Sequence, residues 1–140
     1  MSTVLEISEG IAREVHASQI EEHTGDPYIR HIERVVSLVR GDDQKAVAWL
    51  HDVIEDSPVR AGNLLERGIP SRVVNSVVEL TRIPDEIYAA YIQRIKDSGD
   101  QVAISVKMAD LRDHLRPNCP GRLRSRYERA VESLSLDSRI

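Results

Sequence analysis

The stretch from Ala48 to Asp56 carries the residue types in this chain that are best suited to chemistry. An apolar run is followed there by four polar residues with titratable side chains: His51, Asp52, Glu55 and Asp56. On a helix, side chains four positions apart lie one above the other, so these four form two stacked pairs on one side. The carboxylates repel one another, and near a helix C-terminus they also oppose the helix dipole. A bound cation would turn this repulsion into attraction, so the stretch is a candidate metal site.

Two other segments place a polar side chain within an apolar helical pattern. Asp110 comes after four apolar positions: Ile104, Val106, Met108 and Ala109. A carboxylate in that position is expected to be partly buried and to need a partner. His31 lies in the first or second turn of a predicted helix whose apolar face continues to Val39. Each segment therefore offers one further ligand.

Two imidazoles and two carboxylates would form the ligand set of one divalent ion: His31, His51, Asp52 and Asp110. Such a set suits manganese, iron or zinc better than calcium or magnesium. An ion of this kind polarises a phosphoryl oxygen and lowers the pKa of bound water, which makes that water a nucleophile. Glu55 and Asp56 lie one turn further on and would orient the water or carry its proton.

Each piece of this pattern also has a plainer interpretation. A helical histidine such as His31 is more often a half-buried structural residue than a ligand. The acidic pair at 55–56 is also typical of a solvated helix end. Asp110, with Lys107 and Arg112 nearby, is also typical of an ordinary ion-pair cluster. The joint occurrence of all the pieces favours the metal site.

Helical periodicity dominates the sequence, and strand alternation is nearly absent. About eight helices with short connectors are predicted, at residues 3–22, a segment ending near 41, 44–55, 61–67, 72–81, 86–97, 101–115 and 120–136. The expected N-terminal caps are Asp42 or Asp43, Ser71 and Asp100. The valine-rich runs at 35–39 and 73–78 are also compatible with buried strands, but polar residues at helical offsets favour helix. The predicted fold class is all-α, a single compact helical bundle.

Length and composition fit one globular domain over residues 1–140. Apolar residues make up 41% of the chain and charged residues 30%, a balance typical of soluble proteins rather than membrane proteins. The net charge is −4 and no basic block is present, which argues against nucleic-acid binding but not against a small phosphorylated ligand. Cys119 is the only cysteine, so no disulfide framework forms within the chain, and a reducing, cytoplasmic setting is favoured.

The motifs together resemble the HD superfamily of metal-dependent phosphohydrolases, in which H…HD…D ligands are spread over an all-helical domain. The segment GDPYIRH at 25–31 resembles the G-x-P-Y-I-x-H segment of RelA/SpoT-type alarmone hydrolase domains and their small stand-alone relatives. HDVIEDS at 51–57 resembles their HD-x-x-ED signature, and VKMAD at 106–110 resembles their V-K-L-A-D segment. His16 and Gln19 fit an upstream H-x-x-Q element. The resemblance covers about residues 9–117.

This resemblance implies an HD-domain hydrolase that removes pyrophosphate from the 3′ position of guanosine alarmones, such as guanosine 3′,5′-bis(diphosphate). It also implies Mn²⁺ as the ion, with Fe²⁺ or Zn²⁺ as alternatives. The metal ligands would be His31, His51, Asp52 and Asp110, and the water-positioning residues Glu55 and Asp56. The expected substrate-binding residues are Tyr28, Lys107, Arg112 and His114, of which Lys107 and Arg112 are chosen for their charge and proximity.

The chain departs from the alarmone hydrolases at two places in the expected ligand pocket. Residues 20–23 lack the Arg/Lys pair that commonly follows the H-x-x-Q element, and they carry Glu21 and Glu22 instead. His114 stands where an asparagine is often found. The substrate thus stays open between an alarmone and another nucleotide, with a nucleotidase or phosphodiesterase as the alternative enzyme. A catalytically weak nucleotide-binding sensor is the alternative outside enzymes, and the oligomeric state, a homo-oligomer included, is left open.

Overall fold

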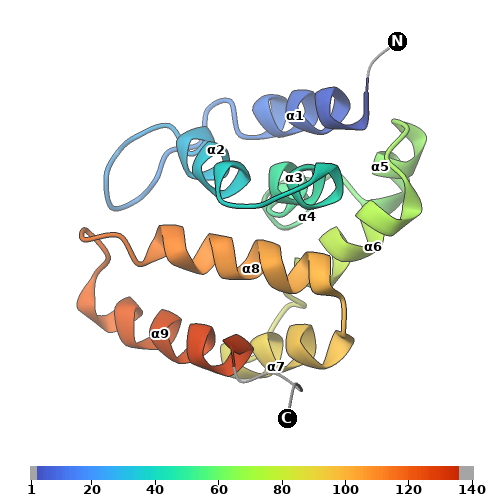
Figure 1. Cartoon of the computed structure of the whole chain (residues 1–140). Helices are drawn as coiled ribbons and strands as arrows, with labels where there is room; N and C mark the ends of the chain where they lie inside the picture. The colour runs from blue at the N-terminus through green and yellow to red at the C-terminus, as the bar shows by residue number, and fades with distance from the viewer. Residues whose placement is uncertain (1–2, 136–140) are drawn as a thin grey trace.

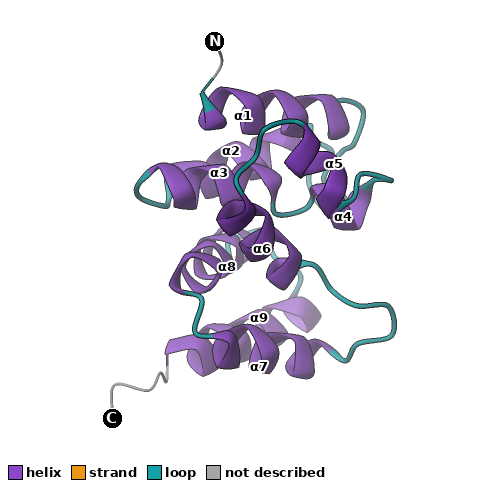
Figure 2. Cartoon of the chain, turned by 90° about the vertical axis from the view of Figure 1, so that its right-hand side faces the viewer, coloured by secondary structure: helices purple, strands orange, loops and turns teal. Residues whose placement is uncertain are grey.

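Nine helices make up the part of the chain that the computed structural model describes, residues 3–135. Within that range no strand is formed, and loops join the helices (Figure 2). The all-α fold class is therefore confirmed. The helices are α1 (Val4–Val15), α2 (Ile29–Ser37), α3 (Asp42–Leu50), α4 (Val53–Asp56), α5 (Ala61–Glu66), α6 (Ser71–Leu80), α7 (Tyr88–Ser98), α8 (Gln101–His114) and α9 (Gly121–Ser135).

Helix α8 lies in the middle of the molecule, between the layer of α1, α2 and α3 and the pair α7 and α9 (Figure 1). It packs against α2, α3 and α6 on one side and against α7 and α9 on the other. Helix α1 covers α3 from the far side. The two helices next to the predicted ligands, α3 and α8, are therefore direct neighbours.

Helix α3 is the most deeply buried element on this side of α8. The five consecutive residues 46–50 are all buried, and Leu50 is fully enclosed. Burying a side chain of that size stabilises the fold by ~1.5–3 kcal/mol. The rigid core thus continues up to the residue directly before His51.

The third predicted helix is interrupted at the histidine–aspartate pair. Helix α3 ends at Leu50, and α4 is a separate turn that begins at Val53. Between them Asp52 has φ −107° and ψ 2°, outside the usual helical range. Neighbouring side chains on an uninterrupted helix diverge by about 100°. The interruption instead places a carboxylate oxygen of Asp52 3.3 Å from Nε2 of His51, and the hydroxyl of Tyr28 donates a hydrogen bond to that carboxylate.

The first predicted helix is too long, because α1 ends at Val15. The chain then folds back on itself, with Ile20 and Pro27 paired in an isolated antiparallel bridge. The amide of Tyr28 donates to the carbonyl of Gln19 at 2.8 Å. These bonds satisfy backbone groups that a longer helix would have paired internally. The α1–α2 loop is thereby an ordered element that carries side chains toward α8.

The helix N-termini agree only in part with the predicted caps. Asp100 caps α8 as predicted, because its side chain accepts a hydrogen bond from the amide of Ala103 at 3.1 Å. Helix α3 is capped by Gly41, with φ +80°, and the expected caps Asp42 and Asp43 lie in its first turn. There their negative charge still favours the positive end of the helix dipole. Similarly, Ser71 is the first residue of α6 and not its cap.

The connection between α6 and α7 is held by Arg94. Its guanidinium pairs with both carboxylate oxygens of Glu86 at 2.9 Å and donates to the carbonyl of Glu79 at 2.8 Å. The backbone carbonyl of Glu86 accepts from Arg82 at 2.7 Å. Residues before Tyr88 are therefore engaged in this network, and α7 begins there rather than at the predicted residue 86.

Both valine-rich runs belong to helices. The run 73–78 is helical throughout, and residues 35–37 of the run 35–39 are helical. The predicted helices at 61–67 and 101–115 have counterparts in α5 and α8, and the predicted end of the last helix at residue 136 lies outside the described residues. Among the described helices, none is both long and apolar enough to span a membrane.

Candidate metal centre

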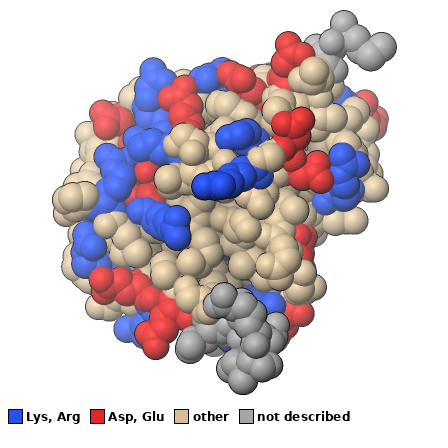
Figure 3. Space-filling model, in the orientation of Figure 1, with Lys and Arg blue, Asp and Glu red and all other residues tan. Residues whose placement is uncertain are grey.

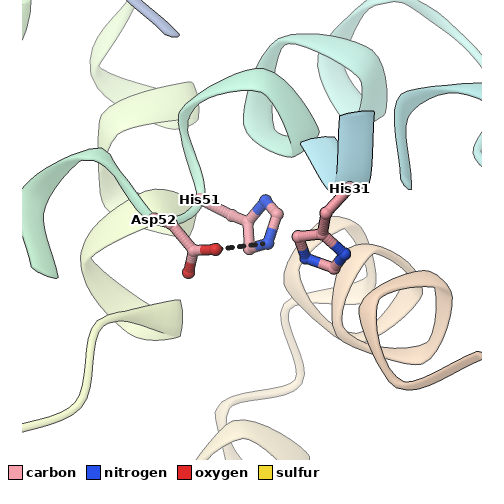
Figure 4. Close-up of side chains that lie close together, drawn as sticks. All are labelled: His31, His51 and Asp52. Carbon is pink, nitrogen blue, oxygen red and sulfur yellow. Dashed lines mark ion pairs between the residues drawn. The ribbon is translucent and has the colours of Figure 1, made fainter. Parts of the chain in front are cut away.

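Three imidazole nitrogens surround one carboxylate oxygen at the contact between α2, α3 and α8. The Oδ1 atom of Asp110 lies 3.0 Å from Nε2 of His31 and 3.3 Å from Nε2 of His51. Nε2 of His114 is 3.2 Å from the same oxygen. Nε2 of His51 also lies 3.3 Å from the carboxylate of Asp52 (Figure 4). The four residues predicted as metal ligands are thus brought together, with a third imidazole beside them.

The ring of His31 is held with Nε2 toward this centre. Its Nδ1 lies 2.6 Å from a carboxylate oxygen of Asp113. Because a carboxylate only accepts hydrogen bonds, Nδ1 carries a proton. Asp113 is held in turn by the guanidinium of Arg34, whose Nε donates to it at 2.6 Å. When the ring is neutral, the lone pair of His31 on Nε2 therefore points to Asp110.

The ring of His51 has the same arrangement. Its Nδ1 donates to the backbone carbonyl of Ala48 at 2.6 Å, one turn earlier in α3. This fixes the tautomer whose Nε2 lone pair faces Asp110 and Asp52. A histidine whose second nitrogen is held by a carbonyl or carboxylate is the usual arrangement around a protein-bound metal.

Neutral imidazole nitrogens that face carboxylates are stabilised by a positive charge between them. The raised pKa values of His31 and His51 indicate that the centre favours such a charge. Burial alone would lower the pKa of His31, but its hydrogen bonds to Asp110 and Asp113 outweigh burial and raise the pKa to about 10. Burial likewise opposes the charged form of His51, yet Asp52 and Asp110 raise its pKa. Both shifts have the same cause, carboxylates that favour a positive charge beside each ring, and the donor set fits a divalent ion at this position.

Two further side chains hold the carboxylates of the centre. The hydroxyl of Tyr28 donates to Asp52. Nζ of Lys107 donates to Oδ2 of Asp110 at 2.9 Å from a nearly buried position. Burial would raise the pKa of Asp110, but the charges of Lys107 and His114 hold it well below its usual range. Of the predicted phosphate-binding residues, Lys107 is therefore already paired with a proposed ligand.

Glu55 and Asp56 lie at the exposed rim of the centre, on α4. A carboxylate oxygen of Glu55 accepts from the backbone amide of Arg82 at 3.1 Å. A carboxylate oxygen of Asp56 accepts from the amide group of Gln19 at 3.3 Å. Partial burial is the main cause that raises the pKa of both groups, and the charge of Asp52 adds to it. Both carboxylates are thus anchored and are better proton acceptors than free ones.

A small pocket of about 180 Å³ opens directly over the centre. Its lining includes the predicted residues Tyr28, Asp52, Glu55, Asp56, Lys107, Asp110 and His114, and it adds Arg82, Tyr88, Tyr91, Arg126 and Tyr127. The guanidinium of Arg126 lies 4.6 Å from the ring centre of Tyr88, and that of Arg82 lies 5.4 Å from it. These two arginines give the pocket positive charge that is not paired with the carboxylates of Asp52 and Asp110.

A larger pocket of about 600 Å³ adjoins the small one and shares Tyr28, His114 and Tyr127 with it. Its remaining lining comes from the α1–α2 loop, from His31 on α2, from Asp113 and Arg116 in and after α8, and from the α8–α9 loop and the start of α9. Glu21 and Glu22 are among these residues. Together the two pockets offer a small charged compartment beside a roomier one, whose lining carries charges of both signs.

The predicted role of Arg112 is corrected by its position. Arg112 is exposed and lines neither pocket. It follows Asp110 by two positions, which places it on the opposite side of α8. Charge and nearness in sequence suggested it, but helical geometry turns it away from the site.

Four supporting residues were missed from the sequence: Arg34, Arg82, Asp113 and Arg126. Asp113 follows Asp110 by three positions, a spacing that places both on one helix face and that could have indicated it. The other three are ordinary arginines in the sequence, and only the packing of α2, the α6–α7 connection and α9 brings them to the site.

No model of a protein family matches the sequence. No curated protein matches it either. Among solved structures, the fold is similar to that of a metazoan ortholog of SpoT that hydrolyzes ppGpp and plays a role in starvation responses. The two share a TM-score of 0.80 and 20% sequence identity, over 99% of this chain and 89% of that chain. At this identity the likeness establishes a shared fold and nothing finer.

Proposed function

We propose that this protein is a metal-dependent phosphohydrolase that acts on a pyrophosphorylated nucleotide. The proposal is carried by contacts between imidazole nitrogens and carboxylate oxygens: His31 with Asp110 at 3.0 Å, and His51 with Asp52 and with Asp110 at 3.3 Å each. A pocket whose lining includes Arg82 and Arg126 lies over these contacts. His31, His51, Asp52 and Asp110 would hold one divalent ion, with manganese, iron and zinc as candidates. The shared fold with a ppGpp-hydrolysing protein supports the same class of substrate.

When bound, such an ion polarises a phosphoryl oxygen and lowers the pKa of a coordinated water. Residues of the chain orient the metal ligands and accept a proton. Asp113 and the carbonyl of Ala48 keep Nε2 of His31 and His51 directed at the centre. Glu55 and Asp56, with their raised pKa values, accept the proton of the attacking water.

The two pockets support a division of the substrate into two parts. Arg82 and Arg126 would face the pyrophosphate in the small pocket, and the larger pocket would take the nucleoside. Water would add to the phosphorus that is bonded to the 3′-oxygen. The bond from that oxygen to phosphorus would break, which releases pyrophosphate and leaves a 3′-hydroxyl. The best candidate within this class is guanosine 3′,5′-bis(diphosphate).

A second candidate is favoured by the acidic residues of the larger pocket. Glu21 and Glu22 would repel a 5′-diphosphate, which a nucleotide with fewer phosphates lacks. A nucleotidase or phosphodiesterase without alarmone specificity would be served by the same metal centre.

A substrate panel separates the two candidates. The metal-free protein, reconstituted in turn with Mn²⁺, Fe²⁺ and Zn²⁺, is incubated with guanosine 3′,5′-bis(diphosphate), with mono- and diphosphates of the common nucleosides and with cyclic nucleotides. Release of pyrophosphate from the bis(diphosphate) alone supports the alarmone substrate. Release of phosphate from the mono- or diphosphates, or opening of the cyclic nucleotides to monophosphates, without release of pyrophosphate from the bis(diphosphate), supports the second candidate. No hydrolysis with any ion contradicts the proposed function.

A further inference from the structure

We infer that His114 is a fifth protein ligand of the metal, which makes the centre richer in imidazole than its four-residue motif. The inference rests on the proposed function for the presence of the ion. From the sequence, His114 was expected to contact the substrate. Its position in the structure points to the ion instead.

His114 lies at ligand-to-ligand distance from Asp110. Two ligand atoms that are each about 2.1 Å from one ion, at right angles, lie ~3.0 Å apart, and at a tetrahedral angle they lie ~3.4 Å apart. Nε2 of His114 is 3.2 Å from Oδ1 of Asp110, between the values of 3.0 Å for His31 and 3.3 Å for His51. The ligand atoms of His31, Asp110 and His114 all lie within 4.8 Å of one another. His114 is therefore as close to the shared carboxylate of Asp110 as the two motif histidines are.

Helix α8 carries both His114 and the shared carboxylate. Asp110 and His114 are four positions apart on α8, so both side chains project from one face. Two ligands at this spacing on one helix form a rigid pair, as the two histidines of H-E-x-x-H do in zinc proteases. The pair requires no rearrangement of the backbone to bind an ion.

The ring of His114 is held from both sides. Its centre lies 4.7 Å from that of His31 and 5.0 Å from that of Tyr127, with which it is stacked at 23°. Helix α9 supplies Tyr127 and thereby fixes the ring against the centre. A side chain that only closed over a substrate would gain nothing from this fixed orientation in the absence of substrate.

The expected consequence is a change in metal preference. Imidazole nitrogens favour the later divalent ions, and the affinity of a nitrogen-containing site rises from Mn²⁺ through Fe²⁺ and Co²⁺. A third imidazole should therefore strengthen binding of Co²⁺ and Zn²⁺ more than binding of Mn²⁺. Replacing His114 by asparagine should reduce this preference.

The test compares metal binding, not turnover, in the wild type and in His114→Asn. Affinities for Zn²⁺, Co²⁺ and Mn²⁺ are measured by competition with a chromophoric chelator. Since loss of a residue that merely supports a ligand costs 10–100-fold in affinity, His114→Asn should weaken Zn²⁺ and Co²⁺ by ~10²-fold or more and Mn²⁺ by less. The matched control, His23→Asn, removes an exposed imidazole from the α1–α2 loop and should leave all three affinities unchanged.

A second readout keeps the inference testable if His114→Asn is poorly folded. In the Co²⁺-loaded wild type, NMR signals shifted by the paramagnetic ion should come from the rings of three histidines. Signals from two histidines only, or unchanged affinities in a folded His114→Asn, overturn the role of His114 and leave the proposed function standing. A wild type that binds none of the three ions overturns the proposed function, and with it this inference.

Discussion

At the scale of single residues, the centre depends on which nitrogen of each histidine carries a proton. Asp113 fixes the proton of His31 on Nδ1, and Arg34 fixes Asp113. These contacts hold the pKa of Asp113 at about 2, against the tendency of burial to raise it. Asp113 is therefore charged at any pH at which the protein would work, and it acts on the metal only through His31.

Replacing Asp113 by asparagine should weaken the metal centre without removing a ligand. An amide is neutral and can present its NH₂ group to Nδ1, so the ring of His31 loses its preferred tautomer. We expect a 10–100-fold loss of metal affinity, measured by competition titration, with the helical circular dichroism signal retained. Arg112→Ala, on the opposite face of the same helix, is the matched control and should leave the affinity unchanged. Equal affinity in Asp113→Asn and wild type would show that this contact does not orient a ligand.

Glu55 and Asp56 should matter for turnover and not for metal binding. Glu55→Gln and Asp56→Asn keep the size of each side chain and remove its ability to take a proton. Turnover of the best substrate should fall by ~10²-fold or more in at least one of them, with one equivalent of metal still bound by elemental analysis. Wild-type rates in both variants would mean that the pair is a solvated helix end.

At the scale of elements, the sequence indicated the helices well and their interruptions poorly. Asp100 could be recognised as the cap of α8 because capping is a local property of the sequence. The interruption of the helix at Asp52 could not be recognised from the sequence. The Tyr28 hydroxyl that donates to this carboxylate comes from a different part of the chain. Residues 16–22 of the α1–α2 loop were assigned to the first helix, since the bridge in which this loop pairs with itself leaves no periodic signal in the sequence.

In the candidate site, too, some residues could be predicted from the sequence and others could not. His31, His51, Asp52 and Asp110 were indicated by polar residues that interrupt apolar helices, and the structure brings them together. That they bind a metal stays a prediction. Supporting arginines carry no such signal, because an arginine at a helix surface is the ordinary case. Only the folded structure separates those that face the site from those, like Arg112, that face away.

The ion pair between Glu86 and Arg94 should make the free energy of unfolding depend on pH in the acidic range. Its two hydrogen bonds lower the pKa of Glu86 to about 2, below the ordinary value of 4.5. A lowered pKa in the folded state gives stability that is present above the unfolded value and lost as pH falls toward the folded one. Glu86→Gln should therefore be less stable than wild type at pH 7 by urea denaturation, and the difference should shrink between pH 4.5 and pH 2. A difference that stays constant over that range would contradict this account of the α6–α7 connection.

At the scale of the whole molecule, charges of both signs are interspersed on the face shown in Figure 3, and the net charge is −4. Attraction of a phosphorylated ligand must therefore come from the cations inside the pockets and from a bound metal. Arg82 and Arg126 in the small pocket provide it, whereas Glu21 and Glu22 oppose it in the larger one.

Glu22 is the acidic residue with which this balance can be tested. Glu21 is paired with Arg34 at 2.7 Å, so its replacement would disturb Asp113 and the metal centre. Glu22 is exposed in the larger pocket. Glu22→Lys should lower KM for guanosine 3′,5′-bis(diphosphate) and change kcat little, as expected for added uniform binding. Steady-state kinetics of Glu22→Gln separate loss of repulsion from gain of attraction, and an unchanged KM in both variants would exclude this loop from the substrate pocket.

The central claim is that one metal ion at this centre makes the protein a phosphohydrolase. It is tested most directly by titrating metal-free protein, at a concentration far above the dissociation constant, with the most effective divalent ion while hydrolysis of the best substrate is followed. We predict a linear rise in rate that breaks at about one ion per chain, and no rise in Asp110→Asn, which removes the carboxylate shared by the histidines. Hydrolysis that proceeds equally without the ion, or that rises equally in Asp110→Asn, would contradict the account.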